Sequence, residues 1–268
     1  MEPKLQKTAE LFGYPNYSLP AVRQGLLGAN YERGDDAFIP GPTSDSLSRY
    51  QLSDLPGTKK EIETIQKLLL NENWLVSTHL GDDALKGAVM AVKSPRVLVL
   101  ATHGYFVPDY EHNRQSGVEF GSLTWRVVDD PLLRSGLLFA GAGRTLRQSN
   151  VSMASGADNG ILTAYEAMNL DLENTDLAVL SACETGLGEI RNGEGVYGLQ
   201  RAFKIAGAKT IIMSLWRVDD EATQELTTGF FQYWLSGMDK ERAFTRSIIE
   251  VKKHHPSPYY WGAFVLVN

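Results

Sequence analysis

Cysteine is the residue type that this sequence has least of. The chain of 268 residues contains a single cysteine, Cys183. An internal disulfide bond and a zinc site built from several cysteines are therefore both excluded. A lone cysteine in an intracellular protein is either a small buried residue or a chemically active one, and its neighbours must decide which.

The sequence also lacks long apolar runs and an excess of basic residues. It has no stretch of about 18 apolar residues, so no transmembrane helix is expected, and its first residues lack the apolar core of a secretory signal. The formal net charge of -6 argues against a general nucleic-acid-binding protein, because such proteins present a basic face. We expect a cytoplasmic protein that binds neither nucleic acid nor membranes directly.

Apolar runs and helical periodicity predict an α/β fold. Strands are expected at 96–101, 136–140, 177–182, 210–215 and 263–267, and helices at 58–70, 82–92, 161–168, 195–206, 221–235 and 240–252. Three of the strands are continuously apolar rather than alternating, which is typical of strands covered on both faces. The pattern predicts a mostly parallel sheet flanked by helices on both faces.

Two segments depart from this rhythm. Residues 14–55 are rich in Pro, Gly, Ser and Asp and predict an extended loop, and residues 105–160 predict a hairpin with surface loops. Loops of this length in a compact domain are usually functional or disordered. The sequence has no internal repeat, and we predict a single domain over 1–268.

Two predicted strands end directly before residues that can carry chemistry. The strand at 96–101 leads into Thr102, His103 and Gly104, and the strand at 177–182 leads into Cys183. Ligands bind beyond the carboxyl ends of parallel strands, so His103 and Cys183 meet there if the two strands are neighbours. Histidine could then deprotonate the cysteine, while the backbone amides of Gly104 and Cys183 could bind a developing oxyanion. Gly104 would also let the chain turn after the histidine.

Each of these residues has an ordinary structural alternative. A strand-end cysteine is by itself more often a small core residue, and a His-Gly pair at a strand end is also more often structural. Their occurrence together at the ends of two buried strands makes the chemical interpretation about as good as the structural one. Sequence pattern alone leaves both open.

At these residues the chain resembles the CHAT domain family of caspase-related cysteine peptidases. The resemblance rests on LATHG at 100–104 and LSACETG at 180–186, with further matches at LPGTKKE 55–61, GA 207–208, SLWRVDD 214–220 and YWGAF 260–264, and faintly at FGYP 12–15. It implies a caspase-like fold in which His103 is the base and Cys183 the nucleophile of peptide-bond hydrolysis, with no metal or cofactor. Such domains are often fused to tetratricopeptide repeats. The resemblance therefore implies a protein substrate, an activating repeat domain or partner protein, a longer parent chain and a role in bacterial defence.

The residues around the nucleophile differ from those of caspases, so the caspase preference for aspartate is not carried over. Ser181 and Glu184 lie beside Cys183, and Asp158 and Asp219 lie at other element boundaries. These four residues are our candidates for substrate binding. They favour a basic or apolar residue before the cut, although Asp158 and Asp219 are also well placed to cap helices.

Two other functions compete with the peptidase. The first is a caspase-like interaction module whose dyad is latent or dead. The second is a nucleotide-binding oxidoreductase, suggested by the G-x-G-x-x-G pattern at 193–198. That fingerprint must follow its strand immediately, whereas here a stretch of residues intervenes, so a loop leading into a helix is the better interpretation. The glycines around 141–144 indicate a loop, and His254 and His255 are expected to be solvated.

Overall fold

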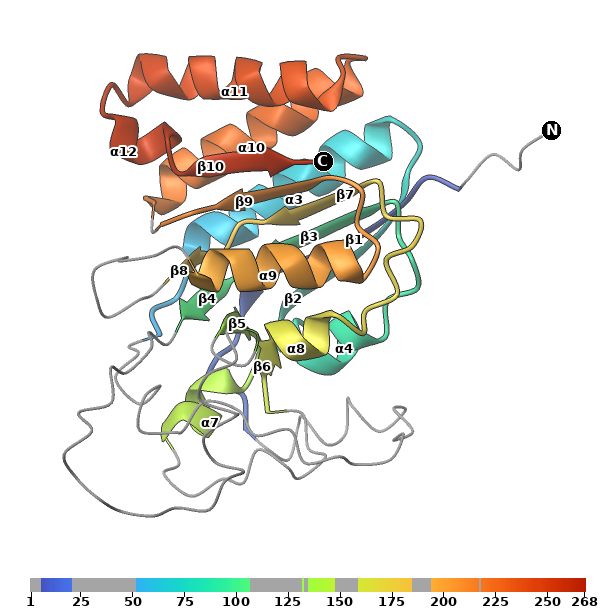
Figure 1. Ribbon diagram of the computed structural model, residues 1–268, viewed down its shortest axis with the longest axis vertical. Helices are drawn as coiled ribbons and strands as arrows, with labels where there is room; N and C mark the ends of the chain where they lie inside the picture. Colours follow the sequence, from blue (N-terminus) through green and yellow to red (C-terminus); the bar gives the residue numbers. More distant parts are fainter. Residues whose placement is uncertain are drawn as a thin grey trace.

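The computed structural model describes residues 6–20, 52–106, 132, 135–147, 159–184, 194–216 and 218–268. Its main sheet has six strands in this part of the chain, in the order β10-β9-β7-β3-β1-β2 (Figure 1). The strands are β1 Thr8–Pro15, β2 Leu75–Gly81, β3 Val97–Ala101, β7 Leu177–Leu180, β9 Ile211–Ser214 and β10 Phe264–Val267. β10 pairs with β9 antiparallel, and the other neighbouring strands pair parallel. The predicted mostly parallel sheet is confirmed.

Helices cover both faces of this sheet (Figure 1). One face carries α3 Pro56–Asn71, α10 Asp220–Leu235 and α11 Lys240–His254; the other carries α4 Lys86–Met90, α8 Ala164–Ala167 and α9 Glu194–Ile205. Successive strand residues alternate between the two cores: Val97 and Val99 pack with the first set of helices, and Leu98 and Leu100 with the second. This two-sided burial explains why the strands are apolar throughout.

A second, smaller sheet continues from the ends of two strands of the first. Its strands lie in the order β6-β5-β4-β8 in the described residues. They are β4 His103–Phe106, β5 Ser135–Leu138, β6 Ile161–Thr163 and β8 Cys183–Glu184. β5 pairs antiparallel with both β4 and β6. β4 follows β3 after one residue, and β8 follows β7 after two.

Local sequence signals account for the helix ends. α3 has Pro56 in its first turn, where the fixed φ of proline suits a helix start. Asp219 caps α10 by accepting hydrogen bonds from the backbone of Glu221 and Ala222, and Asp239 caps α11. The last turn of α11 carries Lys252 and Lys253, whose positive charge suits the negative end of the helix dipole.

Several predicted boundaries need correction. Residues 161–163 form β6 instead of a helix start, because Thr163 is the N-cap of α8 in a capping box with Glu166. The helix expected at 82–92 is limited to Lys86–Met90, and the chain is helical in α7 Ala142–Arg147 where a loop was expected. β1, β2 and the short α12 Pro258–Trp261 were not predicted. Of the two loop-rich segments, residues 21–51, 107–131, 133–134 and 148–158 lie outside the described residues.

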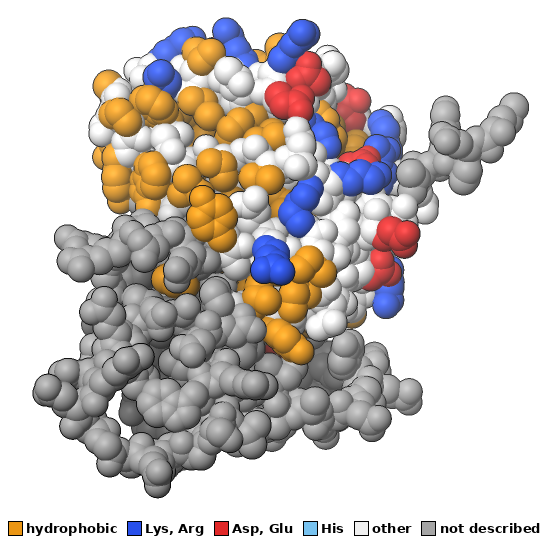
Figure 2. All heavy atoms as spheres, in the orientation of Figure 1, with side chains coloured by type: hydrophobic (Ala, Val, Ile, Leu, Met, Phe, Trp, Pro, Cys, Tyr) orange, Lys and Arg blue, Asp and Glu red, His pale blue; other side chains and the backbone are white. Residues whose placement is uncertain are grey.

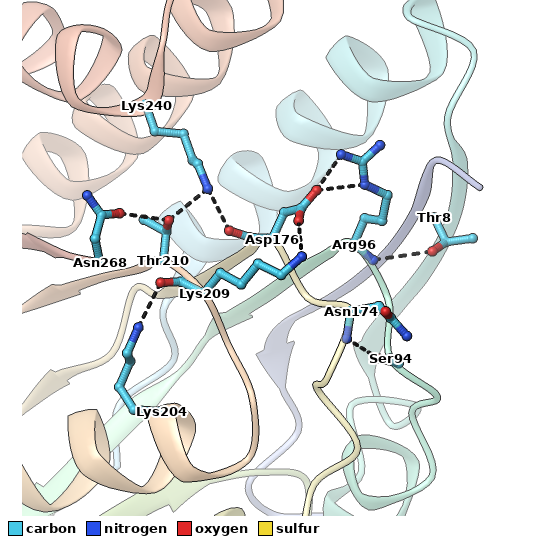
Figure 3. Close-up of polar contacts among 10 residues, drawn as sticks. All are labelled: Thr8, Ser94, Arg96, Asn174, Asp176, Lys204, Lys209, Thr210, Lys240 and Asn268. Carbon is cyan, nitrogen blue, oxygen red and sulfur yellow. Dashed lines mark hydrogen bonds and ion pairs between the residues drawn. The ribbon is translucent and has the colours of Figure 1, made fainter. Parts of the chain in front are cut away.

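A polar network joins the amino ends of the strands (Figure 3). The Asp176 carboxylate accepts hydrogen bonds from Arg96 and from Lys209 Nζ, the latter at 3.0 Å. Lys240 Nζ donates to the Asp176 carbonyl at 2.8 Å and to Thr210 Oγ1 at 2.7 Å. Burial by itself would raise the pKa of Asp176, but the hydrogen bonds and charges of its two cationic partners lower the pKa overall. The network thus ties the starts of β3, β7 and β9 to the start of α11.

Apolar side chains remain exposed on the C-terminal elements. On the face shown in Figure 2, hydrophobic side chains gather over α11, α12 and β10. Ile249 on α11 and Tyr259 on α12 are 43% and 51% exposed.

His254 and His255, expected to be solvated, both contact Glu225, at 2.5 and 3.3 Å. These contacts link the end of α11 to α10.

Candidate active site

The carboxyl ends of β3 and β7 lie side by side. Leu100 is paired with Leu180 in the parallel ladder of these strands. The ladder resumes in β4 and β8, where His103 is paired with Cys183 and Gly104 with Glu184. Neighbouring strands lie about 4.8 Å apart, so the backbone places residues 103 and 183 opposite each other. For Cys183 and Glu184 this placement concerns the backbone alone.

The His103 ring is oriented by a backbone carbonyl. Its Nε2 lies 2.8 Å from the Ser53 oxygen. Because a carbonyl oxygen only accepts hydrogen bonds, Nε2 must carry the proton, and in the neutral ring Nδ1 then carries the lone pair. A base oriented by a third group is the arrangement that activates nucleophiles in many hydrolases. Sequence analysis missed Ser53, because a backbone carbonyl leaves no side-chain signal.

A chain of hydroxyl groups holds the backbone on either side of Thr102. The His103 amide donates to Tyr17 Oη at 3.2 Å, and Tyr17 Oη lies 3.0 Å from Thr102 Oγ1. Thr102 Oγ1 in turn donates to the Leu138 carbonyl. Burial raises the pKa of Tyr17 well above its usual range, so its hydroxyl stays protonated and can serve as both donor and acceptor. Tyr17 is a second residue that sequence analysis missed.

The residues that lead to Cys183 are also held by side chains. Ser181, predicted to contact the substrate, is instead buried and donates a hydrogen bond to Glu61 Oε1 at 2.5 Å. Ser214 Oγ donates to the Ala182 carbonyl at 3.2 Å. The two peptide units before Cys183 are therefore held from α3 on one side and from β9 on the other.

Glu61 is a buried acid with an altered ionisation. Burial raises its pKa from 4.5 to about 7, while hydrogen bonding with Ser181 and Thr227 acts in the opposite direction and the charge of Asp220 raises it further. Asp220 accepts a hydrogen bond from the Gly57 amide at 2.6 Å, and burial raises its pKa as well. The carboxyl groups of Glu61 on α3 and Asp220 on α10 thus act on each other near the end of β7.

The other predicted site residues have varied positions. Asp219 is exposed and caps α10; Asp158 lies outside the described residues. Gly104 lies inside β4, so the expected turn after His103 is wrong. A side chain at Gly104 would have its nearest heavy atoms at 3.7 Å, an ordinary contact distance.

Two further features bear on the kind of site present. No group of three or more His, Cys, Asp or Glu side chains among the described residues could hold a metal ion. In the same residues, no helix combines the length and the apolar character needed to cross a membrane.

Comparison with known proteins adds a family to this geometry. The family model of the CHAT domain matches residues 16–268. The chain is also similar to tetratricopeptide repeat protein 28 of Homo sapiens and of Mus musculus, at 28% identity over 110 residues in each case. The alignment covers 40% of this chain and 4% of the length of each relative.

Proposed function

The chain belongs to the CHAT domain family, and from this premise we propose that it is a cysteine endopeptidase acting on a protein substrate. The pairing of His103 with Cys183 across β4 and β8 is the observation that supports this proposal. The dyad residues come from the ends of adjacent strands, and a carbonyl group orients the histidine.

The reaction follows from these positions. His103 Nδ1 takes the thiol proton of Cys183, and the thiolate attacks the carbonyl carbon of the scissile peptide. The backbone amides of Gly104 and Cys183 would bind the oxyanion of the tetrahedral intermediate. Protonated His103 then gives its proton to the leaving amine, and a water molecule, deprotonated by His103, hydrolyses the resulting thioester. The Ser53 carbonyl can accept the hydrogen bond from Nε2 in both the neutral and the protonated ring, so the ring keeps its orientation.

Burial of the histidine supports a need for activation. His103 is 2% exposed, so a substrate reaches the ring only after neighbouring segments move. The relatives are named for tetratricopeptide repeats, and we propose that a repeat domain or partner protein supplies this activation. The purified chain should then have low basal activity. Strong cleavage of many unrelated proteins by the chain alone would contradict this.

A latent interaction module is the second candidate function, because the same burial would also suit a site that never opens. A peptide ketone that alkylates active thiols separates the two functions, since Cys183 is the one cysteine in the chain. The endopeptidase predicts labelling at Cys183 and cleavage of a peptide library. It also predicts loss of both in Cys183→Ala and a decrease of at least about 10²-fold in His103→Ala.

A matched control tests whether the loss of labelling and cleavage is specific to His103 or follows from removing any histidine of the sheet. His79 on β2 contacts Glu10 at 2.9 Å and stacks on Phe12, away from the dyad. His79→Ala should be labelled and should cleave like the wild type. Undiminished cleavage by Cys183→Ala or His103→Ala would refute the dyad assignment, and labelling of Cys183 that does not depend on His103 would favour the interaction module.

A further inference from the structure

The carboxyl group of Glu61 lies in the core, next to the segment that leads to Cys183. Glu61 is 1% exposed, and it is the one acidic residue that is buried in the described part of the chain. A buried acid costs free energy unless hydrogen bonds compensate for its lost hydration. The proposed chemistry of His103 and Cys183 does not use this group directly, so its presence calls for another role.

The contact of Glu61 with Ser181 connects it to the nucleophile. Ser181 is 4% exposed and donates to Glu61 Oε1 at 2.5 Å. It follows the last residue of β7 and precedes Cys183 by two positions. The intervening carbonyl, that of Ala182, is bound by Ser214 Oγ. Side chains from α3 and β9 thus fix the peptide that leads into β8.

The position of Cys183 depends on the backbone that enters β8. In the described residues, the ladder of β8 with β4 pairs Cys183 with His103 and Glu184 with Gly104. A catalytic group displaced by about 1 Å can lose about 10²-fold in rate. Anchors just before β8 therefore matter for the distance between Cys183 and His103.

We propose that Glu61 is a positioning residue for the nucleophile, acting through the Ser181 hydroxyl to fix the backbone that presents Cys183 to His103. This inference rests on the proposed function. The acceptor oxygen of Glu61 can bind the Ser181 hydroxyl whether or not the carboxyl is ionised, because a protonated carboxyl retains acceptor capacity.

The surroundings of Glu61 fit an anchor better than a proton donor for the reaction. Asp220, at the start of α10, is the charged group that acts on Glu61, and Thr227 on the same helix contributes a hydrogen bond. The strands packed against α3 present apolar side chains to this layer, including Leu11 and Val99. The group is therefore enclosed between helix and sheet, where substrate does not reach.

Alkylation of Cys183 by iodoacetamide tests the proposal without requiring peptidase activity. The reaction rate follows the thiolate fraction, so its pH midpoint reports how well His103 stabilises the thiolate. Ser181→Ala removes the donor, and we expect alkylation at pH 6.5 to slow about tenfold, with the midpoint displaced toward that of free cysteine. Glu61→Gln keeps an acceptor of the same shape and should stay within about twofold of wild type. On a cleaved peptide, Ser181→Ala should lower kcat and leave KM unchanged.

Ile65→Ala is the matched control for lost stability. Ile65 lies one turn after Glu61 on α3 and is fully buried in the same core, but it is apolar and does not contact Ser181 through a hydrogen bond. It should lower the melting temperature at least as much as Ser181→Ala and leave alkylation unchanged. Equal alkylation rates in Ser181→Ala and wild type, or equal slowing in Ile65→Ala, would overturn the proposal. His103→Ala tests the proposed function separately: if its alkylation is as fast as that of wild type, the dyad is refuted, whereas slowing in Ser181→Ala but not in Ile65→Ala supports the positioning role of Glu61 whether or not a peptide is cleaved.

Discussion

Replacing Glu61 with glutamine should remove a large part of the pH dependence of stability. Burial raises the pKa of Glu61 from 4.5 to about 7. Between these values the folded chain holds a proton that the unfolded chain has released, so raising the pH favours unfolding. The stabilisation is therefore complete below about pH 4.5 and is lost as the pH rises through about 7. Glutamine has a similar shape and does not ionise.

The size of the effect follows from the two pKa values. Their difference corresponds to about 3 kcal/mol, at about 1.4 kcal/mol for each pKa unit. Most of it falls between pH 5 and pH 8, because in most of this range the carboxyl is ionised in the unfolded chain and still largely protonated in the folded one, whereas above it both states are ionised. Burial also raises the pKa of Asp220, and that contribution stays in both proteins. The informative quantity is thus the difference in unfolding free energy between wild type and Glu61→Gln.

Urea denaturation at pH 5 and at pH 8 measures this difference. Relative to wild type, Glu61→Gln should gain about 2 to 3 kcal/mol of unfolding free energy between the two conditions. Glu63→Gln makes the same chemical change two residues along α3, at a partly exposed position, and should follow the wild type. Parallel pH dependences in wild type and Glu61→Gln would show that Glu61 is not a neutral buried acid, and the reasoning from its burial would be wrong.

Three other substitutions test separate parts of the structure. Gly104→Ala should leave the melting temperature nearly unchanged, because the nearest atoms to the new methyl group, including Ala182 Cβ, lie at 3.7 Å. Peptide cleavage by this variant should nevertheless fall at least about tenfold, because the methyl group crowds the oxyanion. Asp176→Asn should lower the unfolding free energy at pH 7 by about 1 to 3 kcal/mol in urea denaturation. This difference should shrink as the pH falls, because the lowered pKa of Asp176 gives a stabilisation that is present above its usual range and lost in acid. Tyr17→Phe should lower the unfolding free energy by about 1 to 3 kcal/mol in the same measurement, because it removes the hydroxyl that binds both Thr102 and the His103 amide. An unchanged unfolding free energy in Asp176→Asn or Tyr17→Phe would contradict the assigned contacts.

The central strands could be predicted because burial on both faces makes them apolar throughout. Val97–Ala101 and Leu177–Leu180 are buried at every position, and their sequences show it. β2 was missed because it lies at the edge of the sheet and its residues are exposed or partly exposed. β1 lies in the interior of the sheet, yet it contains Glu10, Gly13 and Pro15, residue types that are depleted in strands.

The site was predictable to the extent that side chains at strand ends reveal it. His103 and Cys183 stand out because each follows an apolar run. Ser53 acts through its carbonyl oxygen, which any residue could supply. Glu61 lies among Lys59, Lys60 and Glu63, a stretch with the composition of a solvated helix face. Its spacing was nevertheless informative, because Glu61 precedes the buried Ile65 by four residues and therefore shares its helical face.

Contacts at both ends of the sheet help to fix the register of β3 against β7. Arg96 and Asp176 are bound to each other directly before these strands, and Glu61 holds Ser181 directly after β7. Val97 is paired with Leu177, and His103 with Cys183, so the offset between the two segments is the same in both ladders. A slip of one residue would turn every side chain of a strand to the opposite face, and it would also move residue 183 away from residue 103. Contacts that are remote from the chemistry, at the amino ends of the strands, therefore help to determine whether the proposed nucleophile and base meet.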